Sequence, residues 1–345
     1  MNLVIRLLAG GVMRMSDNIL ELKNLKKWFP VRRSLKDVIK RQRHWVKAVD
    51  GISFNIRRGE IFGLIGESGC GKTTTGKLIM KLLDATDGQI IFNGKDVTEL
   101  PKERTRAYKR DVQMIFQDPY ASMNPRFRIR DVLTEPLEIH GLKESSEARE
   151  KVAAQALKDV KLTPPTKFLG RYSHMLSGGQ RQRAATARNL ILDPSFIVAD
   201  EPVSMVDLST RAEILAMLKE VQRAKNLTYL YITHDLSTAR YFTDRIAVMY
   251  LGRIVEMADS GKLIDKRMHP YTKALIAAVN EPVAGNQNKL KEVPIKGEIP
   301  SAANIPEGCR FHPRCVKAIP ECKVGDDPEL KEVEDGHFVA CHLVD

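Results

Sequence analysis

One glycine-rich loop constrains the fold of this chain more than any other feature. Residues 66–73 read GESGCGKT, which fits the pattern G-x-x-x-x-G-K-[ST]. The apolar run at 61–65 predicts a buried strand before the loop, and residues 74–83 predict a helix after it. Strand, loop and helix in this order are the context in which the pattern holds the phosphates of a nucleotide. The chain is therefore expected to be an α/β protein with a parallel-sheet core.

The loop offers several groups to a bound ATP. Its glycines let backbone N–H groups point at one phosphate, and the N-terminus of the helix adds positive partial charge. Lys72 is expected to reach the β- and γ-phosphates, and the Thr73 hydroxyl is expected to ligate Mg²⁺. The predicted nucleotide-binding residues of this loop are Gly66, Glu67, Ser68, Gly69, Cys70, Gly71, Lys72, Thr73 and Thr74.

A second apolar run, at 196–199, ends in two carboxylates. Four apolar residues in a row suit a parallel strand that is covered on both faces. Asp200 at the end of this strand is a predicted Mg²⁺ ligand. Glu201 is the predicted catalytic base that polarises the attacking water, a role typically worth ~10²–10⁴ in rate.

Two more strand-like runs end in polar side chains. His234 follows the run at 228–233, at the end of a strand where ligands of open α/β sheets bind, so we expect it to contact the γ-phosphate and the attacking water. Gln117 follows the run at 114–116, and its neutral amide can both coordinate Mg²⁺ and sense the water. The predicted catalytic residues are therefore Glu201, His234 and Gln117.

A second glycine-rich segment, LSGGQ at 176–180, predicts another anion site. Ser177 can cap a helix that begins at Gly178, and the N-terminus of such a helix offers N–H donors to an anion. Gly179 and Gln180 complete the segment.

Together these motifs resemble the ATP-binding cassette family, the motor subunits of ABC transporters. The loop at 66–73 is similar to Walker A, 196–200 to Walker B, 176–180 to the signature, Gln117 to the Q-loop and His234 to the switch histidine. The resemblance spans about residues 20–265. It implies that two cassettes pair head to tail, with each ATP held between one Walker A and the other cassette's signature.

The same resemblance implies two further contacts. An aromatic side chain near the start stacks on adenine, for which we choose Phe29 and place Trp28 second. The segment SMVD at 204–207 departs from the family's usual Ser-Ala-Leu-Asp, but it keeps Asp207, which is expected to contact the partner cassette.

Three stretches, at 116–126, 269–275 and 308–315, look like the ATPases of oligopeptide and dipeptide importers. The insertion at 32–45 resembles the second, F-type ATPase of such a pair. The resemblance implies a sister ATPase in a heterodimer, two transmembrane permease subunits and an extracytoplasmic binding protein, with the chain peripheral on the cytoplasmic face of the cell membrane. Relatives of this branch carry peptides, nickel or oligosaccharides.

Two rival functions belong to the same superfamily. A soluble ABC ATPase that acts on nucleic acid usually carries two cassettes or a long coiled-coil insertion, whereas this chain has one phosphate loop, one signature and no heptads. We therefore expect no nucleic-acid partner. An efflux ATPase is disfavoured by the C-terminal extension and the His-Pro-Tyr segment, on resemblance alone.

Four of the five cysteines, Cys309, Cys315, Cys322 and Cys341, lie within the last forty residues. Clustered thiols in a cytosolic chain favour a metal over disulfides, and four thiolates suit Zn²⁺ or a [4Fe–4S] cluster. Unmetallated thiols are the alternative. Some peptide-importer ATPases carry an iron–sulfur cluster, so the resemblance favours that assignment.

The organisation follows from these landmarks. Residues 1–18 are expected to be a disordered or mis-annotated extension, residues 19–265 the cassette with a helical subdomain at about 118–189, and residues 266–345 a C-terminal extension with the four-cysteine motif. Within the cassette, residues 20–111 are expected to form the nucleotide core together with an antiparallel β subdomain. No apolar run approaches the ~20 residues that span a bilayer. The net charge of +12 has a basic cluster at 26–47, which we interpret as a solvated loop or as a contact with anionic lipid.

Overall fold

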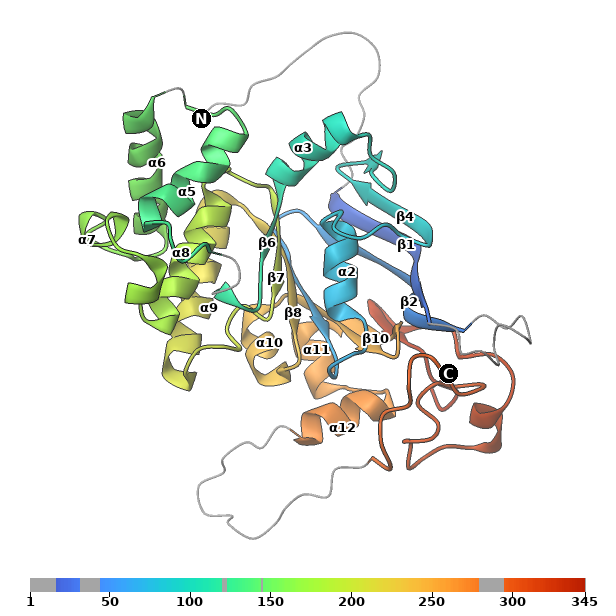
Figure 1. Cartoon of the computed structure of the whole chain (residues 1–345). Coiled ribbons are helices and arrows are strands. Elements are labelled where there is room, and N and C mark those ends of the chain that lie inside the picture. Colours follow the sequence, from blue (N-terminus) through green and yellow to red (C-terminus); the bar gives the residue numbers. More distant parts are fainter. Residues whose placement is uncertain (1–16, 32–43, 120–122, 144, 279–294, 345) are drawn as a thin grey trace, which may run out of the picture.

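A computed structural model describes residues 17–31, 44–119, 123–143, 145–278 and 295–344 (Figure 1). Residues 1–16 of the expected N-terminal extension, most of the basic insertion and part of the linker before the cysteines lie outside the described residues, whereas Asn18 already belongs to the first strand.

Two sheets form the frame of the molecule. The first is antiparallel, with the order β2-β1-β4-β5. Its strands are β1 (Asn18–Pro30), β2 (Trp45–Arg57), β4 (Asp87–Phe92) and β5 (Lys95–Asp96). The second has eight strands in the order β11-β12-β10-β9-β3-β8-β7-β6. Its strands are β3 (Ile61–Ile65), β6 (Val112–Ile115), β7 (Phe196–Asp200), β8 (Thr228–Thr233), β9 (Arg245–Tyr250), β10 (Arg253–Asp259), β11 (Lys331–Glu334) and β12 (His337–Val339).

The larger sheet is mixed, so the expected parallel core is correct only for part of it. Strands β6, β7, β8, β3 and β9 are parallel, whereas β10, β12 and β11 continue the sheet antiparallel. A tight turn at Leu251 and Gly252 causes the change, because both residues have positive φ and return the chain directly beside β9.

The continuous apolar runs of the central strands are explained by burial on both faces. In β3, Phe62 and Leu64 pack into one hydrophobic cluster, and Ile61 and Ile65 pack into another on the opposite face. The first cluster joins the central sheet to α2 and the antiparallel sheet, and the second joins it to the helices. Alternate residues of one strand therefore serve two cores.

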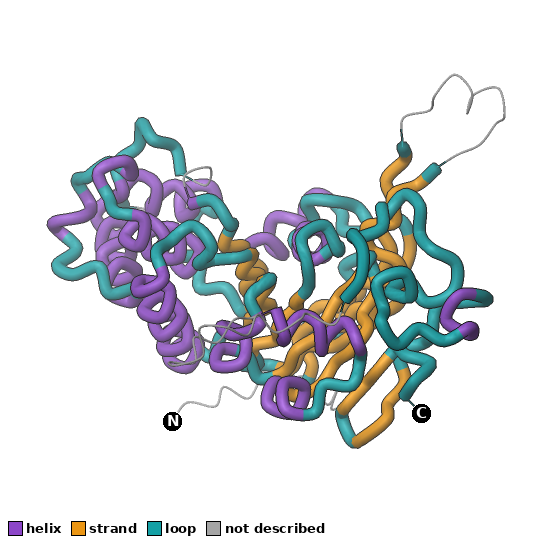
Figure 2. Tube along the Cα trace, turned by 90° about the horizontal axis from the view of Figure 1, so that it is seen from below, coloured by secondary structure: helices purple, strands orange, loops and turns teal. Residues whose placement is uncertain are grey.

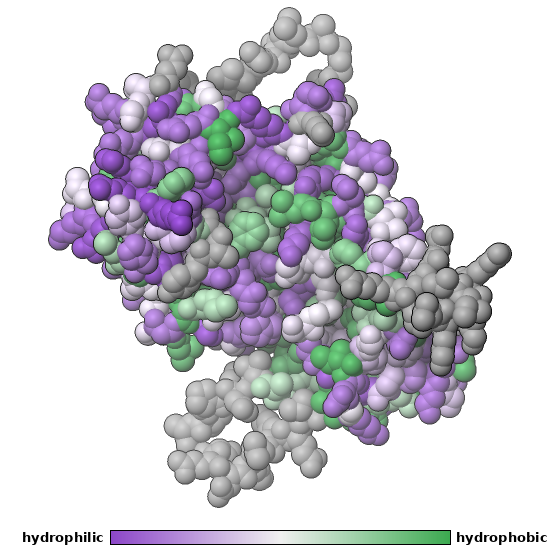
Figure 3. All heavy atoms as spheres, viewed as in Figure 1, coloured by the Kyte–Doolittle hydropathy of each residue, from purple (hydrophilic) through white to green (hydrophobic). Residues whose placement is uncertain are grey.

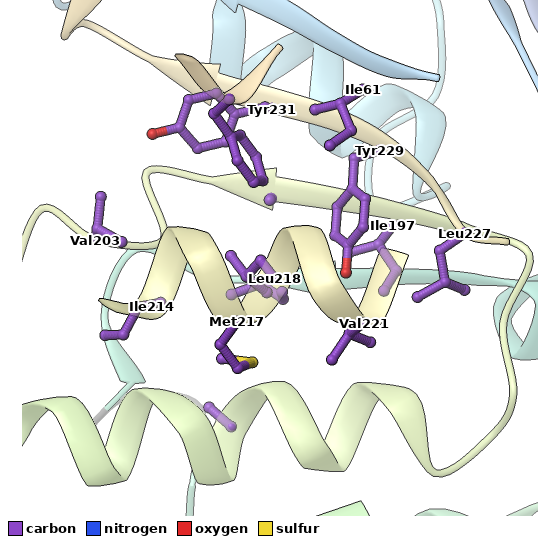
Figure 4. Packing of buried hydrophobic residues seen from close by; sticks show 14 of the residues in the cluster. Ile61, Ile197, Val203, Ile214, Met217, Leu218, Val221, Leu227, Tyr229 and Tyr231 are labelled. Atoms are coloured by element: carbon purple, nitrogen blue, oxygen red, sulfur yellow. The ribbon is translucent and has the colours of Figure 1, made fainter. Parts of the chain in front are cut away.

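Helices cover the second face. They are α5 (Ile129–Ile139), α6 (Ser146–Asp159), α7 (Thr166–Leu169), α8 (Gly178–Leu190), α9 (Leu208–Lys225), α10 (Leu236–Phe242), α11 (Ser260–Asp265) and α12 (Pro270–Ala278). Figure 4 shows α9 between the strands and another helix, with Leu218 and Val221 near the strand residues Ile197 and Tyr229. Figure 2 shows the helices α5–α8 gathered as a helical lobe at one end of the molecule.

Two helices, α2 (Lys72–Ile79) and α3 (Lys102–Asp111), lie on the side of the antiparallel sheet (Figure 1). Helix α2 begins two residues before the predicted start and ends earlier than predicted. Gly71 already serves as its N-cap, and Lys81 has a φ of 54°, which stops the helix just beyond Met80.

The end of the chain completes the sheet of the cassette. Strand β12 pairs with β10, with Val339 opposite Glu256, and β11 pairs with β12. Among the described residues between α12 and β11 (Figure 1), Arg310 contacts Asp50 on β2 and Arg314 contacts Glu67 just after β3. The extension is therefore continuous with the nucleotide-binding sheet.

None of the described helices combines the length and the apolar character needed to cross a membrane. The face drawn in Figure 3 is mostly hydrophilic, and its hydrophobic side chains occur in separate groups.

Candidate functional site

The phosphate loop joins β3 to α2 in a shape that depends on glycine. Gly71 has a φ of 114°, and a Cβ atom there would lie 2.1 Å from the carbonyl oxygen of Ala48. Lys72 is buried, and its ammonium donates to the carbonyl oxygens of Gly66 at 2.7 Å and Glu67 at 2.9 Å. The predicted phosphate-binding ammonium therefore lies inside the curve of the loop. Cys70 is also buried, which raises the pKa of its thiol.

The two predicted Mg²⁺ ligands of this region are neighbours. The hydroxyl of Thr73, in the first turn of α2, donates to the carboxylate of Asp200 at the end of β7 over 3.1 Å. Burial raises the pKa of Asp200, the bond from Thr73 opposes that rise, and the nearby charge of Glu201 adds to it. The pair presents hard oxygen atoms, the ligand type that Mg²⁺ prefers.

The three predicted catalytic side chains also converge. Gln117, Glu201 and His234 each follow the carboxyl end of one of the adjacent strands β6, β7 and β8. The Gln117 amide nitrogen lies 3.1 Å from one oxygen of Glu201, and His234 Nδ1 lies 2.9 Å from the other. Both oxygens of the carboxylate are thus engaged by neighbours from flanking strands.

The backbone at Glu201 is unusual for a residue with a side chain. Its φ is 47°, and its N–H donates to the carbonyl oxygen of Ile232 on β8 over 2.9 Å. Such left-handed geometry is sparsely populated and persists where the surroundings enforce it. It turns the carboxylate toward a cavity of about 60 Å³ that Thr233, His234 and Arg211 also line. That space is large enough for water.

The signature segment forms the start of α8. Ser177 Oγ accepts from the N–H of Gln180 at 3.3 Å, and the Gln180 side chain accepts from the N–H of Ser177 at 3.2 Å. This reciprocal pair is a capping box, and it presents the helix N-terminus at Gly178. Figure 1 places α8 on the helical side of the molecule and α2 on the other side of the central strands.

The residues predicted to stack on adenine and to contact the partner cassette make other contacts in this structure. Phe29 and Trp28 are both half-buried on β1. The Lys27 ammonium lies 5.2 Å from the centre of the Phe29 ring, whereas Trp28 donates to the Asp50 carboxylate at 2.8 Å. Asp207 caps α9 by accepting from the N–H of Thr210 at 3.0 Å, and its bonds from Ser209 and Thr210 lower its pKa to about 2.

Sequence reasoning missed two residues that contact the phosphate loop. The hydroxyl of Tyr271, in α12, accepts from the N–H of Glu67 over 2.9 Å. Arg314 donates two hydrogen bonds to the Glu67 carboxylate, at 2.6 and 2.9 Å. Both belong to segments that were noticed for their resemblance, at 269–275 and 308–315, but no pattern in the sequence connects either one to a loop some 200 residues earlier.

The structure does not arrange the four C-terminal cysteines as a metal-ion site. Burial raises the pKa of Cys309 to about 12, and the charges of Cys322 and Cys341 add to that shift. Burial also raises the pKa of Cys315, with a further contribution from Cys322. Among the residues that the structure describes, no group of three or more His, Cys, Asp or Glu side chains is arranged to hold a metal ion. The predicted four-thiolate site is therefore not supported by this geometry.

Comparisons with known proteins agree with the geometry. A family model described as "ABC transporter" matches residues 49–204, and one described as "Oligopeptide/dipeptide transporter, C-terminal region" matches residues 255–322. The chain is 47% identical to the oligopeptide transport ATP-binding protein AppF of Bacillus subtilis (strain 168) over 330 residues, which cover 95% of this chain and 98% of that protein. It is 49% identical to the putative oligopeptide transport ATP-binding protein YkfD of the same organism over 299 residues, 86% of this chain and 90% of that protein.

A solved structure shares the fold. The ATP-binding cassette MJ0796, described as a dimer in a post-hydrolysis state bound to ADP and Pi, superposes with a TM-score of 0.61 at 28% identity. The match covers 70% of this chain and 98% of that one.

Proposed function

Because the chain belongs to the ABC transporter family, as an ATP-binding protein of its oligopeptide/dipeptide branch, we propose that it drives the import of oligopeptides or dipeptides by hydrolysing ATP. The observation that carries this proposal is the meeting of Gln117, Glu201 and His234 beside the Thr73–Asp200 pair. A phosphate loop alone needs none of these side chains to bind a nucleotide. Their convergence provides the means to hydrolyse one.

The phosphates and the metal have named partners in this chain. When ATP binds, the Lys72 ammonium would leave the carbonyl oxygens of Gly66 and Glu67 and bind the β- and γ-phosphates. Backbone N–H groups of residues 66–74 would surround these phosphates. Thr73 and Asp200 would hold Mg²⁺, which neutralises developing charge between the phosphates when it is bound. Phosphate and water oxygens would complete its shell, since Mg²⁺ usually keeps few protein ligands.

Glu201 is the proposed base for the attacking water. Its carboxylate lies 16% exposed at the cavity, and it accepts the proton as the water attacks the γ-phosphate. His234 and Gln117 hold the two carboxylate oxygens and therefore orient the base. Gln117, which the sequence suggested as a Mg²⁺ ligand, donates its amide N–H to the base.

The rest of the assembly follows from what this chain presents. The exposed start of α8 at Ser177 and Gly178 would receive the γ-phosphate of an ATP held by a sister ATPase. Asp207 and the adenine-stacking Phe29 complete the proposed nucleotide interface. We place residues 19–265 in the cassette and residues 266–345 in the extension, with the chain peripheral at the cytoplasmic face of the membrane beside two permeases and served by an extracytoplasmic binding protein.

Glu201→Gln tests the hydrolytic half of the proposal. The variant should bind Mg-ATP as wild type does and lose about 10²–10⁴ of the turnover, since it keeps the shape of the side chain and loses the base. Lys72→Ala is the matched binding variant, and it should weaken ATP affinity directly. Turnover near wild type in Glu201→Gln would remove Glu201 as the base, and unchanged affinity in Lys72→Ala would remove the phosphate loop.

The transport half needs the assembled complex. Membrane vesicles that contain this chain with its sister ATPase, permeases and binding protein should take up a labelled pentapeptide when ATP is supplied, and Glu201→Gln should abolish that uptake. Uptake of Ni²⁺ or of an oligosaccharide, with none of peptide, would assign the complex to another solute.

The C-terminal thiols carry a separate part of the proposal. We propose that Cys309, Cys315, Cys322 and Cys341 bind a [4Fe–4S] cluster, because all four lie within the last forty residues and four thiolates are its usual ligand set. Chain purified without oxygen should hold four iron and four sulfide. One zinc, or neither metal, would contradict the cluster.

A further inference from the structure

An arginine of the C-terminal extension is joined to the phosphate loop. Arg314 and Glu67 are 247 residues apart in the sequence, yet the guanidinium meets the carboxylate through two parallel hydrogen bonds of 2.6 and 2.9 Å. Bidentate pairs of this kind combine charge with a fixed orientation. The Arg314 side chain is only 7% exposed and that of Glu67 is 26% exposed, so the pair is largely shielded from solvent. The bond to Glu67 raises the pKa of Arg314.

Glu67 is joined to the extension and to the phosphate-binding lysine at once. Its N–H donates to the Tyr271 hydroxyl, and its carbonyl oxygen accepts from the Lys72 ammonium. Its carboxylate is held by Arg314. The position of this one residue therefore depends on α12 and the extension, and the position of Lys72 depends on this residue.

A second arginine of the same segment supports the loop from behind. Arg310 donates to the carbonyl oxygen of Leu251 at 2.6 Å and also contacts the buried Asp50 carboxylate. The next residue, Gly252, donates its N–H to the Cys70 carbonyl oxygen at 2.9 Å and accepts from the Asp50 N–H at 2.9 Å. Arg310 therefore acts on the phosphate loop through the backbone at Leu251 and Gly252.

An aromatic residue between the two arginines fixes the segment to the core. Phe311 is fully buried, and its ring lies 5.3 Å from that of Tyr250 and 5.4 Å from that of Tyr271. Arg314 itself lies 5.8 Å from the centre of the Tyr250 ring. Packing therefore holds the segment at 309–315 rigidly enough for Arg314 to fix the direction of Glu67.

We propose that Arg314 is a positioning residue for ATP binding, acting through Glu67, so that the C-terminal segment at 309–315 sets the affinity of the phosphate loop for Mg-ATP. The inference rests on the proposed function of residues 66–74. Without Arg314, the Glu67 carboxylate would stand uncompensated within the loop that receives a polyanion. It would repel the phosphates and attract Lys72 away from them.

The test is a double-mutant cycle on the full chain, with Mg-ATP titrated calorimetrically. Arg314→Gln should weaken binding about tenfold or more, and Arg314→Lys should recover part of the loss, because it restores the charge without the fork. In a Glu67→Gln background, Arg314→Gln should change the affinity less than threefold. Lys317→Gln is the control, since it removes an equal charge from an exposed position three residues away.

Kinetics separate positioning from general damage. In the slow ATPase reaction of the full chain, Arg314→Gln should raise KM by the same factor and change kcat less than twofold, whereas a damaged fold would lower the fraction of active sites and hence kcat. Affinity within twofold of wild type in Arg314→Gln would overturn the proposal. So would an equal loss in the wild-type and Glu67→Gln backgrounds. If wild type itself fails to bind Mg-ATP, the proposed function fails as well, and the two failures are thereby distinguished.

Discussion

The two glycine-rich segments of this chain are held in shape by different means. The signature at 176–180 is organised by its own helix, through a capping box that joins residues three positions apart. The phosphate loop is organised from a distance, by Ala48 on β2, Tyr271 on α12 and Arg314 in the extension. The first is a local structure in which Ser177 is exposed. The second combines exposed residues such as Ser68 and Gly69 with the buried Lys72 and is contacted by residues from three distant parts of the chain.

This difference predicts which substitutions will alter the geometry of each segment. A locally capped helix end keeps its geometry when remote residues change, because its capping hydrogen bonds join residues only three positions apart. A loop that is supported by residues about 20, 200 and 247 positions away responds to each of them. Mutations far from the phosphate loop should therefore alter ATP binding by this chain, while the partner's ATP should meet a signature that depends on few other residues.

Two glycines of the phosphate loop give the sharpest test of whether distant residues hold this loop in shape. Gly71→Ala should lower the free energy of unfolding by about 3 kcal/mol or more, since a positive φ and a contact with Ala48 act together. Gly69→Ala is the matched control, because Gly69 also has a positive φ but a Cβ atom there would meet nothing within 4 Å. It should cost about 1–2 kcal/mol. Equal losses in urea unfolding would show that β2 does not constrain the loop.

A fall in pH should weaken the support that α12 gives to the phosphate loop and leave the capping box of α8 unchanged. His269, which precedes α12 and accepts from the Tyr271 N–H, is fully buried, and burial lowers its pKa from 6.5 to about 4 despite the opposing charge of Glu256. The unfolded chain therefore binds the proton first, so this stabilisation is complete above pH 6.5 and is lost as the pH falls toward 4. Lowering the pH from 7 to 5 should cost about 2 kcal/mol of unfolding free energy.

His269→Asn provides the control for that titration. Asparagine keeps a hydrogen-bond acceptor and cannot titrate, so the free energy of unfolding should fall less between pH 7 and pH 5 in the variant than in wild type. Identical pH dependence in the two proteins would show that other groups dominate.

The smallest expected effect concerns the signature. Ser177→Ala removes the cap of α8 and should lower the free energy of unfolding by only about 1 kcal/mol. Binding of Mg-ATP to the isolated chain should stay near wild type, while turnover of the chain paired with its sister ATPase should fall at least tenfold. A large loss of ATP affinity in the isolated chain would contradict the independence of the two segments.

Much of the fold was predictable, because its central strands are short apolar runs that end in polar residues. The strands at 61–65, 196–200 and 228–233 follow the sequence pattern closely, and the confirmed ABC cassette explains their order. The antiparallel edge was not foreseen. The strands at 331–334 and 337–339 are short and lie in a region with few apolar residues, so no periodicity marks them as part of the core sheet.

The candidate site also contains residues that the sequence could predict and residues that it could not. Gln117, Glu201 and His234 could be grouped from sequence because each follows a predicted parallel strand, and parallel strands share one carboxyl edge. Their roles in hydrolysis stay predictions. Arg314 and Tyr271 could not be connected to Glu67, because an ion pair and a hydrogen bond over such separations depend on how the extension packs. The metal site expected from the four cysteines stays a prediction for a related reason, since spacing alone does not fix where thiols point.

The attachment of the last strand has a consequence for biosynthesis. A ribosome makes residues 66–73 well before Arg314 and before β12, the strand that pairs with β10. During that interval the nascent cassette has an open sheet edge at β10 and a nucleotide loop without its arginine. Maturation of the ATP site is thus coupled to synthesis of the residues up to β12.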